Sequence, residues 1–218
     1  MASELIDELP LPQRLALAYA PAAARPATLA LFALDARLGQ AVRQASEPIM
    51  AQMRLAWWRD QLKLDPTERE RHDKLMAALD LFAGEGASLG ALVDGWELLL
   101  SEELACETIR AFASGRAQAF LALRRVIGAD DDPEAILRAG QRWALGDLAA
   151  GLSNMQECGK VLELHEESDG ASPSLSRSMR PLSVLGGLAG RSLRRGGGPL
   201  LDGPASGLAA IRLGLIGR

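Results

Sequence analysis

The stretch SEPIMAQMRLAWWRDQL, residues Ser46–Leu62, decides the fold predicted for this chain. It holds two of the four tryptophans, Trp57 and Trp58, next to each other. On a helical wheel its apolar side chains cover most of the circumference, which predicts a helix inside a bundle rather than on its surface. The apolar positions besides the tryptophans are Ile49, Met50, Met53, Leu55, Leu62 and, just beyond the stretch, Leu64.

Two charged residues, Arg54 and Asp60, fall inside this apolar arc. Buried charge is costly unless it is paired, so both are expected to have partners. Arg54 is placed to stack on Trp58 one turn later, and Asp60 to pair with an arginine of another helix. We interpret Arg54, Trp57, Trp58 and Asp60 as an ion network of the core or the lining of a pocket for a ligand. The arginines considered as partners of Asp60 are Arg116, Arg124 and Arg142.

The composition favours one helical domain covering residues 1–218. The chain is 48% hydrophobic and 24% charged, with one tyrosine, and such a length is typical of a single domain. The net charge of −4 disfavours a general nucleic-acid-binding protein, which needs a basic surface. The two cysteines, Cys106 and Cys158, lie far apart, so neither a disulfide framework nor a zinc site is predicted.

The charge is unevenly distributed along the chain. Residues 171–218 contain seven arginines and one aspartate. A basic segment of this kind suggests peripheral contact with an anionic membrane, although a solvated face has the same composition. With no apolar run near the roughly 18 residues of a membrane span, we expect a cytoplasmic protein, and contact with the inner face of the membrane stays one of the two readings of the basic segment. The arginines singled out for that contact are Arg191, Arg194, Arg195 and Arg212.

Capping and breaking residues predict about eight or nine helices and no strand, hence an all-α fold. Thr28 is expected to cap one helix, and Thr67 with Glu70 to form a capping box. Residues 165–176 are rich in serine and acidic residues and are expected to form an exposed linker. The predicted helices are Gln13–Tyr19, Thr28–Ala45, Pro48–Leu64, Thr67–Phe82, Ser88–Leu100, Ser101–Ile127, Glu134–Asn154, Leu182–Arg195 and Pro204–Ile216.

Asp35 and the aspartates at 130–132 are carboxylates considered as metal ligands. Asp35 is the only acid of its predicted helix, so it is either a remaining metal ligand or one half of an ion pair, at the surface or between helices. The run Asp130–Asp132 precedes a proline and a predicted helix, and helix capping explains it without a metal.

Most of the chain resembles the squalene/phytoene synthase family. The resemblance is carried by ALAYAPAAARPATLALFALDARL (Ala16–Leu38) and SEPIMAQMRLAWWRD (Ser46–Asp60). Within the family these segments are most similar to the branch of mitochondrial complex I assembly factors and their bacterial relatives. The resemblance implies a single terpenoid-synthase-like bundle around a central cavity. Weaker matches are DGWELLL (Asp94–Leu100), ALGDLAAGLSN (Ala144–Asn154) and PLSVLGGLAGRSLRR (Pro181–Arg195).

Active members of that family ionise a prenyl diphosphate with Mg²⁺ held by acidic motifs on facing helices. At the corresponding places this chain has no aspartate pair, and of the acids only Glu157 remains. Because metal affinity depends on the number of carboxylate ligands, the resemblance implies a bundle without catalytic residues or a resident metal. The acidic positions are occupied by Gly39, Gln40, Arg43, Leu99 and Gln156.

Two functions follow as expectations. The first is a pseudoenzyme of this fold, acting as an accessory protein in respiratory-complex assembly or binding an isoprenoid or other lipid. The alternative is an active, Mg²⁺-dependent prenyltransferase of isoprenoid and carotenoid biosynthesis with rearranged acidic ligands. The acidic motifs discriminate between them, and their loss favours the first.

Overall fold

The computed structural model describes residues 2–45, 47–70, 73–168 and 174–217. Within these ranges the chain has 11 α-helices, one short 3₁₀-helix and no strand, which confirms the predicted all-α class. The elements are α1 (Ala2–Asp7), α2 (Leu11–Ala18), α3 (Arg25–Arg43), α4 (Pro48–Lys63), α5 (Lys74–Ala78), η1 (Leu79–Phe82), α6 (Gly86–Leu98), α7 (Cys106–Val126), α8 (Pro133–Gly151), α9 (Met155–Ser168), α10 (Arg180–Leu193) and α11 (Pro204–Ile216).

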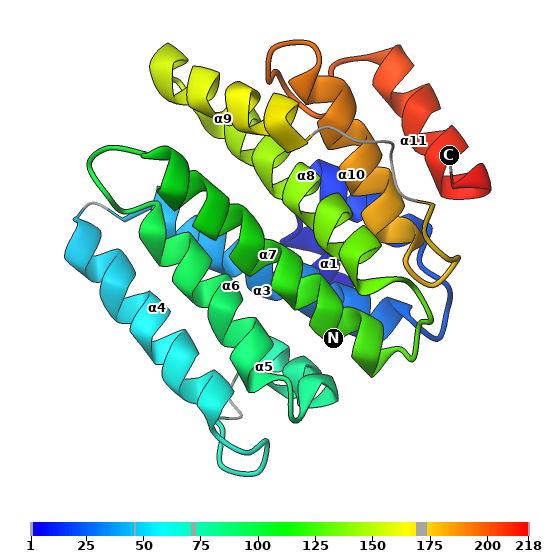
Figure 1. Ribbon diagram of the computed structural model, residues 1–218. Helices are drawn as coiled ribbons and strands as arrows, with labels where there is room; N and C mark the ends of the chain where they lie inside the picture. Colours follow the sequence, from blue (N-terminus) through cyan, green and yellow to red (C-terminus); the bar gives the residue numbers. More distant parts are fainter. Residues whose placement is uncertain (1, 46, 71–72, 169–173, 218) are drawn as a thin grey trace.

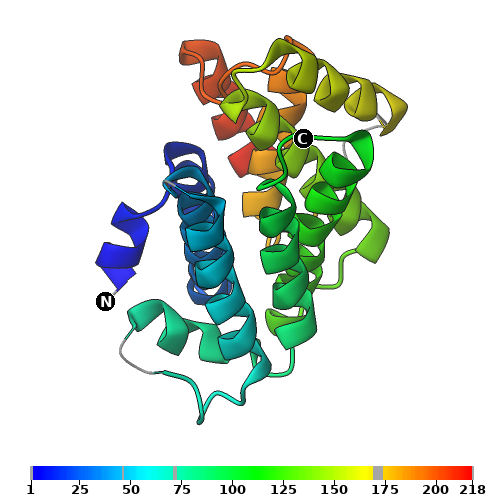
Figure 2. The same ribbon diagram turned by 90° about the vertical axis from the view of Figure 1, so that its left-hand side faces the viewer.

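The long helices form a row in the order α4, α6, α7, α8, α10 and α11, each packed on the next (Figure 1). Helix α3 crosses behind this row, and Figure 2 shows it between α1 and the pair α6–α7. Most side chains of α3 are buried, including Phe32, Leu34 and Leu38 at 0% exposure. The hydrophobic core therefore lies between α3 and the middle of the row.

Small residues bring the helices of the row close together. A Cβ atom on Gly115 of α7 would clash with the carbonyl oxygen of Ala91 in α6. A Cβ on Gly146 of α8 would lie 2.5 Å from the Cβ of Ala189 in α10. Contacts this short leave no room for a side chain, so the backbones of neighbouring helices pack directly on one another.

Helix α4 is at one end of the row, and its predicted burial on most sides is wrong. It buries the side that faces α6, where Leu55 and Leu62 are 0% and 1% exposed. Ile49 and Met53 on the other side are 54% and 62% exposed. Because apolar side chains surround α4 on nearly all sides, its sequence does not indicate which side packs on the bundle. In the structure α4 packs mainly on α6. Ser46 lies outside the described residues.

The position of α4 predicts very different costs for two substitutions on it. Met53→Ser should change the free energy of unfolding by no more than about 0.5 kcal/mol, because the side chain is largely in water. Leu55→Ala should lower it by about 2–5 kcal/mol, because it leaves a cavity in the core. Urea denaturation followed by circular dichroism measures both, and equal costs would place α4 inside the bundle.

Three predicted helix starts are wrong by more than two residues. The helix predicted to begin at Ser101 begins at Cys106. Helix α3 begins at Arg25 with Pro26 in its first turn, and Thr28 lies inside it, donating its hydroxyl hydrogen bond to the carbonyl oxygen of Ala24 at 2.8 Å. The predicted capping box of Thr67 and Glu70 starts no helix. In that loop the buried Arg69 donates to two carbonyl oxygens, those of Leu64 at 3.1 Å and Leu79 at 3.3 Å, which holds the chain in a non-helical path.

The region around the expected linker is more helical than predicted. After α8, the side chain of Asn154 accepts hydrogen bonds from the backbone N–H of Gln156 at 2.9 Å and of Glu157 at 3.4 Å, and so starts α9. This helix continues through His165, whose side chain is buried, so the start of the linker at residue 165 is wrong. Residues 169–173 lie outside the described ranges, and Leu175 is again buried.

The aspartate run at 130–132 caps a helix, as predicted. The side chain of Asp132 accepts hydrogen bonds from the backbone N–H of Glu134 at 3.2 Å and of Ala135 at 3.3 Å. Asp131 has a separate role, because its carboxylate accepts from both the N–H and the hydroxyl of Ser176, each at 2.6 Å. The run thus starts α8 and holds the segment that leads into α10.

Candidate functional site

The middle of the bundle contains a buried ion network centred on Asp35 and Arg116, which are 3% and 1% exposed. Arg116 donates to both carboxylate oxygens of Asp35, at 2.9 and 2.7 Å. Trp96 Nε1 and Gln13 Nε2 donate to the same carboxylate at 3.0 and 2.9 Å. Asp35 therefore forms the interhelix ion pair that was one of its two readings, with a partner from α7.

Arg116 is held on its other sides by Asp147 and by aromatic rings. Its Nη1 donates to Asp147 at 2.8 Å, and its guanidinium carbon lies 3.7 Å from the centre of the Trp143 ring. Burial alone would lower the pKa of Arg116, but the charges of Asp35 and Asp147 raise it above its ordinary value. The guanidinium is therefore a permanent cation that neutralises carboxylates of α3 and α8.

The central space implied by the resemblance is largely filled by these side chains. A pocket of 250 Å³ remains beside the network, lined in part by Asp35, Arg43, Trp96 and Asp147. Both carboxylates already bind Arg116, so they do not fit the donor set of a magnesium cluster. Among the described residues, no three His, Cys, Asp or Glu side chains are grouped as a metal site requires.

The positions that the resemblance aligns with the acidic motifs of the family make ordinary packing and surface contacts. Gly39 is covered by Arg43 and Trp96, and Gln40 hydrogen-bonds to Gln44 on the surface. Leu99 packs against the core at the end of α6, and Gln156 lies in the first turn of α9.

Arg54, Trp57, Trp58 and Asp60 do not form the buried ion network that was one reading of this group. Arg54, Trp57 and Trp58 line one pocket of 510 Å³ at the surface, and Asp60 does not line it. Arg54 is exposed, and Asp60 is exposed with an ion pair to Lys63 of its own helix at 3.7 Å. The two rings do touch, with centres 4.9 Å apart, but only Trp58 is buried.

The ion pairs of α4 with another helix are instead made by Arg59. Arg59 donates to Asp94 at 2.7 Å and to Glu97 at 2.5 Å, both on α6. Of the three arginines suggested for Asp60, Arg116 pairs with Asp35 and Asp147.

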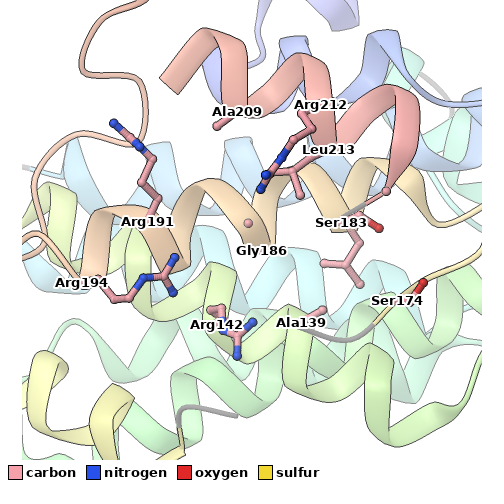
Figure 3. Close-up of a pocket in the computed structure, with 13 residues that line it drawn as sticks. Ala139, Arg142, Ser174, Ser183, Gly186, Arg191, Arg194, Ala209, Arg212 and Leu213 are labelled. Carbon is pink, nitrogen blue, oxygen red and sulfur yellow. The ribbon is translucent and has the colours of Figure 1, made fainter. Parts of the chain in front are cut away.

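A second site lies at the opposite end of the row, between α8, α10 and α11. It is a pocket of 290 Å³ lined by four arginines: Arg142 from α8, Arg191 and Arg194 at the end of α10, and Arg212 from α11. Figure 3 shows Arg212 reaching from α11 toward Gly186 on α10, with Arg142 and Ala139 on the other side of that helix. We call this site the arginine pocket.

Glycines of α10 make room for the arginine pocket. A Cβ on Gly190 would lie 3.0 Å from Cδ of Arg142 and 3.4 Å from Nη1 of Arg194, so both side chains cross this glycine. A Cβ on Gly187 would clash with Leu213 of α11. The sequence GGLAG at residues 186–190 thus lets α8 and α11 approach α10 closely while the arginines gather over it.

The charge of the arginine pocket is unbalanced. None of the described residues that line it carries a carboxylate. Arg191, Arg194 and Arg212 make no ion pair with the described part of the chain, and the hydroxyl of Ser183, 7% exposed, has no hydrogen-bond partner there. Because Arg191, Arg194 and Arg212 line one pocket without a counter-charge among its described lining residues, an oxyanion that accepts hydrogen bonds from them would stabilise the pocket.

Three of the four arginines predicted for membrane contact line this pocket, and the fourth does not. Arg195 pairs with Asp202 at 2.8 Å. Arg142 completes the set, but nothing in the sequence joins it to arginines about fifty residues later. The signals that indicated the region were the basic charge of residues 171–218 and the glycines of α10.

Comparison with known proteins adds no name to this geometry. No family model, curated protein or solved structure matches the chain. The arginine pocket is therefore assigned from its own chemistry.

Proposed function

We propose that this protein is a non-catalytic binding protein that holds the phosphate or diphosphate group of an amphiphile, such as an isoprenoid diphosphate, in the arginine pocket. The observation that carries the proposal is the gathering of Arg191, Arg194 and Arg212 without a carboxylate among the described lining residues. Arginine binds phosphate with two parallel hydrogen bonds, which makes it the residue of choice for this recognition.

The rest of the lining supports an amphiphile over a bare anion. Beside the arginines, the wall is formed by the apolar surface of Leu182, Leu213 and Ala209. A volume of 290 Å³ accommodates a diphosphate and a few carbon atoms, and a longer chain would extend out of the pocket. Nucleic acid is disfavoured, since the protein carries a net charge of −4.

The proposal agrees with the resemblance to squalene/phytoene synthases without their chemistry. The carboxylates nearest the central pocket, Asp35 and Asp147, are bound by Arg116, so a Mg²⁺-dependent prenyl transfer has no free pair of ligands there. We therefore favour an accessory role in which a prenyl or lipid phosphate is bound and not turned over. Assembly of a respiratory complex is one process that such a protein would serve.

Binding measured by calorimetry tests the proposal. Farnesyl diphosphate and inorganic diphosphate are expected to bind, and farnesol, which lacks the charged group, is not. Arg194→Gln and Arg212→Gln should each weaken binding by about 10-fold to 100-fold, the value of one or two charge-assisted hydrogen bonds. Arg195→Gln is the matched control, because that arginine pairs with Asp202, and it should bind like the wild type.

Two further measurements distinguish a lipid phosphate from an isoprenoid diphosphate as the ligand, and binding from catalysis. Tighter binding of dihexanoyl phosphatidic acid than of farnesyl diphosphate would assign the pocket to a lipid headgroup. The proposal fails if the control and the pocket variants lose affinity equally, or if no phosphate compound binds. Mg²⁺-dependent release of diphosphate from farnesyl diphosphate by the purified protein would replace it with the prenyltransferase.

A further inference from the structure

Helix α11 exposes apolar side chains on the face that points away from the bundle. Leu208, Ile211, Leu215 and Ile216 are 69%, 47%, 72% and 61% exposed. Spacings of three and four residues place Leu208, Ile211 and Leu215 on one side of the helix, and Ile216 lies at the edge of that side. They are four of the twelve large apolar side chains that are exposed in the described part of the chain, and they lie on one helix at the end of the row.

The inner face of the same helix is made of small residues. Ser206 and Ala210 are 1% and 0% exposed, and a Cβ on Gly214 would clash with the ring of Tyr19. The usual pattern of a surface helix is therefore reversed, with bulky aliphatic groups outside and small groups inside. Aliphatic groups gathered on an outer face mark an interaction surface.

The positive charge around the exposed face of α11 indicates which kind of partner binds there. Helix α11 carries one charged residue, Arg212, and the neighbouring end of α10 adds Arg191 and Arg194. In residues 174–217 the only acid is Asp202, which pairs with Arg195. A second copy docking face to face would bring these unneutralised arginines together, whereas a surface with anionic headgroups over an apolar layer complements both features.

We propose that α11 binds flat on an anionic lipid bilayer. Leu208, Leu215 and Ile211 enter the boundary between headgroups and acyl chains, and Arg212 with the arginines at the end of α10 contacts the lipid phosphates. No helix in the described ranges is long and apolar enough to cross a bilayer, so the proposed attachment is peripheral.

The aliphatic face of α11 is separate from the site of the proposed function, although Arg191, Arg194 and Arg212 belong to both. The aliphatic residues do not line the arginine pocket. Substituting them therefore tests the membrane face alone, and either proposal can fail while the other stands.

Flotation with liposomes tests the inference on the full chain. The wild type is expected to float with vesicles that contain 30% phosphatidylglycerol in phosphatidylcholine and to remain soluble with phosphatidylcholine alone. The double variant Leu208→Ser/Leu215→Ser should reduce the bound fraction at least 10-fold, and 0.5 M salt should reduce binding of the wild type. The matched control Met53→Ser/Met155→Ser removes exposed apolar groups elsewhere and should float like the wild type.

Specific results of flotation and sedimentation would overturn the membrane inference. Equal flotation of the Leu208/Leu215 variant and the wild type, or no flotation of the wild type, overturns the inference. A concentration-dependent dimer by sedimentation that this variant abolishes, without vesicle binding, would assign the face to a second copy. Because both leucines are exposed, the variant should keep the circular dichroism spectrum and unfolding midpoint of the wild type.

Discussion

Replacing Arg116 by methionine is expected to lower the free energy of unfolding by about 3–5 kcal/mol. The substitution keeps much of the apolar volume but leaves the carboxylate of Asp35 in the core with only Trp96 and Gln13 as donors. An uncompensated charge of this kind costs more than the lost ion pair contributes, because it has no water to solvate it. Urea denaturation followed by circular dichroism measures the change.

The same helix provides the control. Arg110 of α7 also makes an ion pair, with Glu167 at 2.7 Å, but its side chain is 54% exposed. Arg110→Met should leave the stability close to that of the wild type, because the exposed ion pair is screened by water. Adding Asp35→Leu to Arg116→Met should recover much of the loss, because no buried charge then remains at that point. If Arg116→Met costs no more than Arg110→Met, the network does not contribute to stability as described.

Replacing Gly115 by valine is expected to lower the free energy of unfolding by about 3 kcal/mol or to prevent folding. The new Cβ would clash with the carbonyl oxygen of Ala91, and a backbone atom in a helix cannot move aside as a flexible side chain can. Helices α6 and α7 would have to separate along their contact. Thermal unfolding and the yield of soluble protein both report the effect.

Gly90 of α6 is the control for this prediction and should respond in the opposite direction. A Cβ built there meets no atom within 4 Å, so alanine fits without strain. Gly90→Ala should raise the stability by about 0.5–1 kcal/mol, because alanine loses less backbone entropy on entering a helix. A loss of stability at both glycines would mean that the contact with Ala91 is not the cause.

The sequence predicts helices well where a local signal marks them. Asp132 before Pro133 starts α8 as expected, and Pro48 is the first residue of α4. Such signals depend on side chains within one turn of the helix end, so no other part of the protein needs to be known.

What cannot be predicted from the sequence is which side of a helix meets a neighbour. Arg54 and Arg59 lie on the same mostly apolar helix, and only the position of α6 decides that Arg59 is paired and Arg54 is exposed. The arginine pocket poses the same difficulty, because Arg142 and Arg212 line one pocket only through the packing of α8 and α11 on α10. Both cases depend on contacts between residues far apart in the chain.

The carboxylate of Asp35 also has a consequence for the order of folding. Its partners Gln13, Trp96 and Arg116 are 22, 61 and 81 residues away along the chain. Contacts between consecutive helices close short loops, whereas these close long ones at a larger entropic cost. We therefore expect α6 and α7 to associate early and the contacts of Asp35 with Gln13, Trp96 and Arg116 to form late. The rate-limiting step of folding is then the docking of α3 against helices that are already paired.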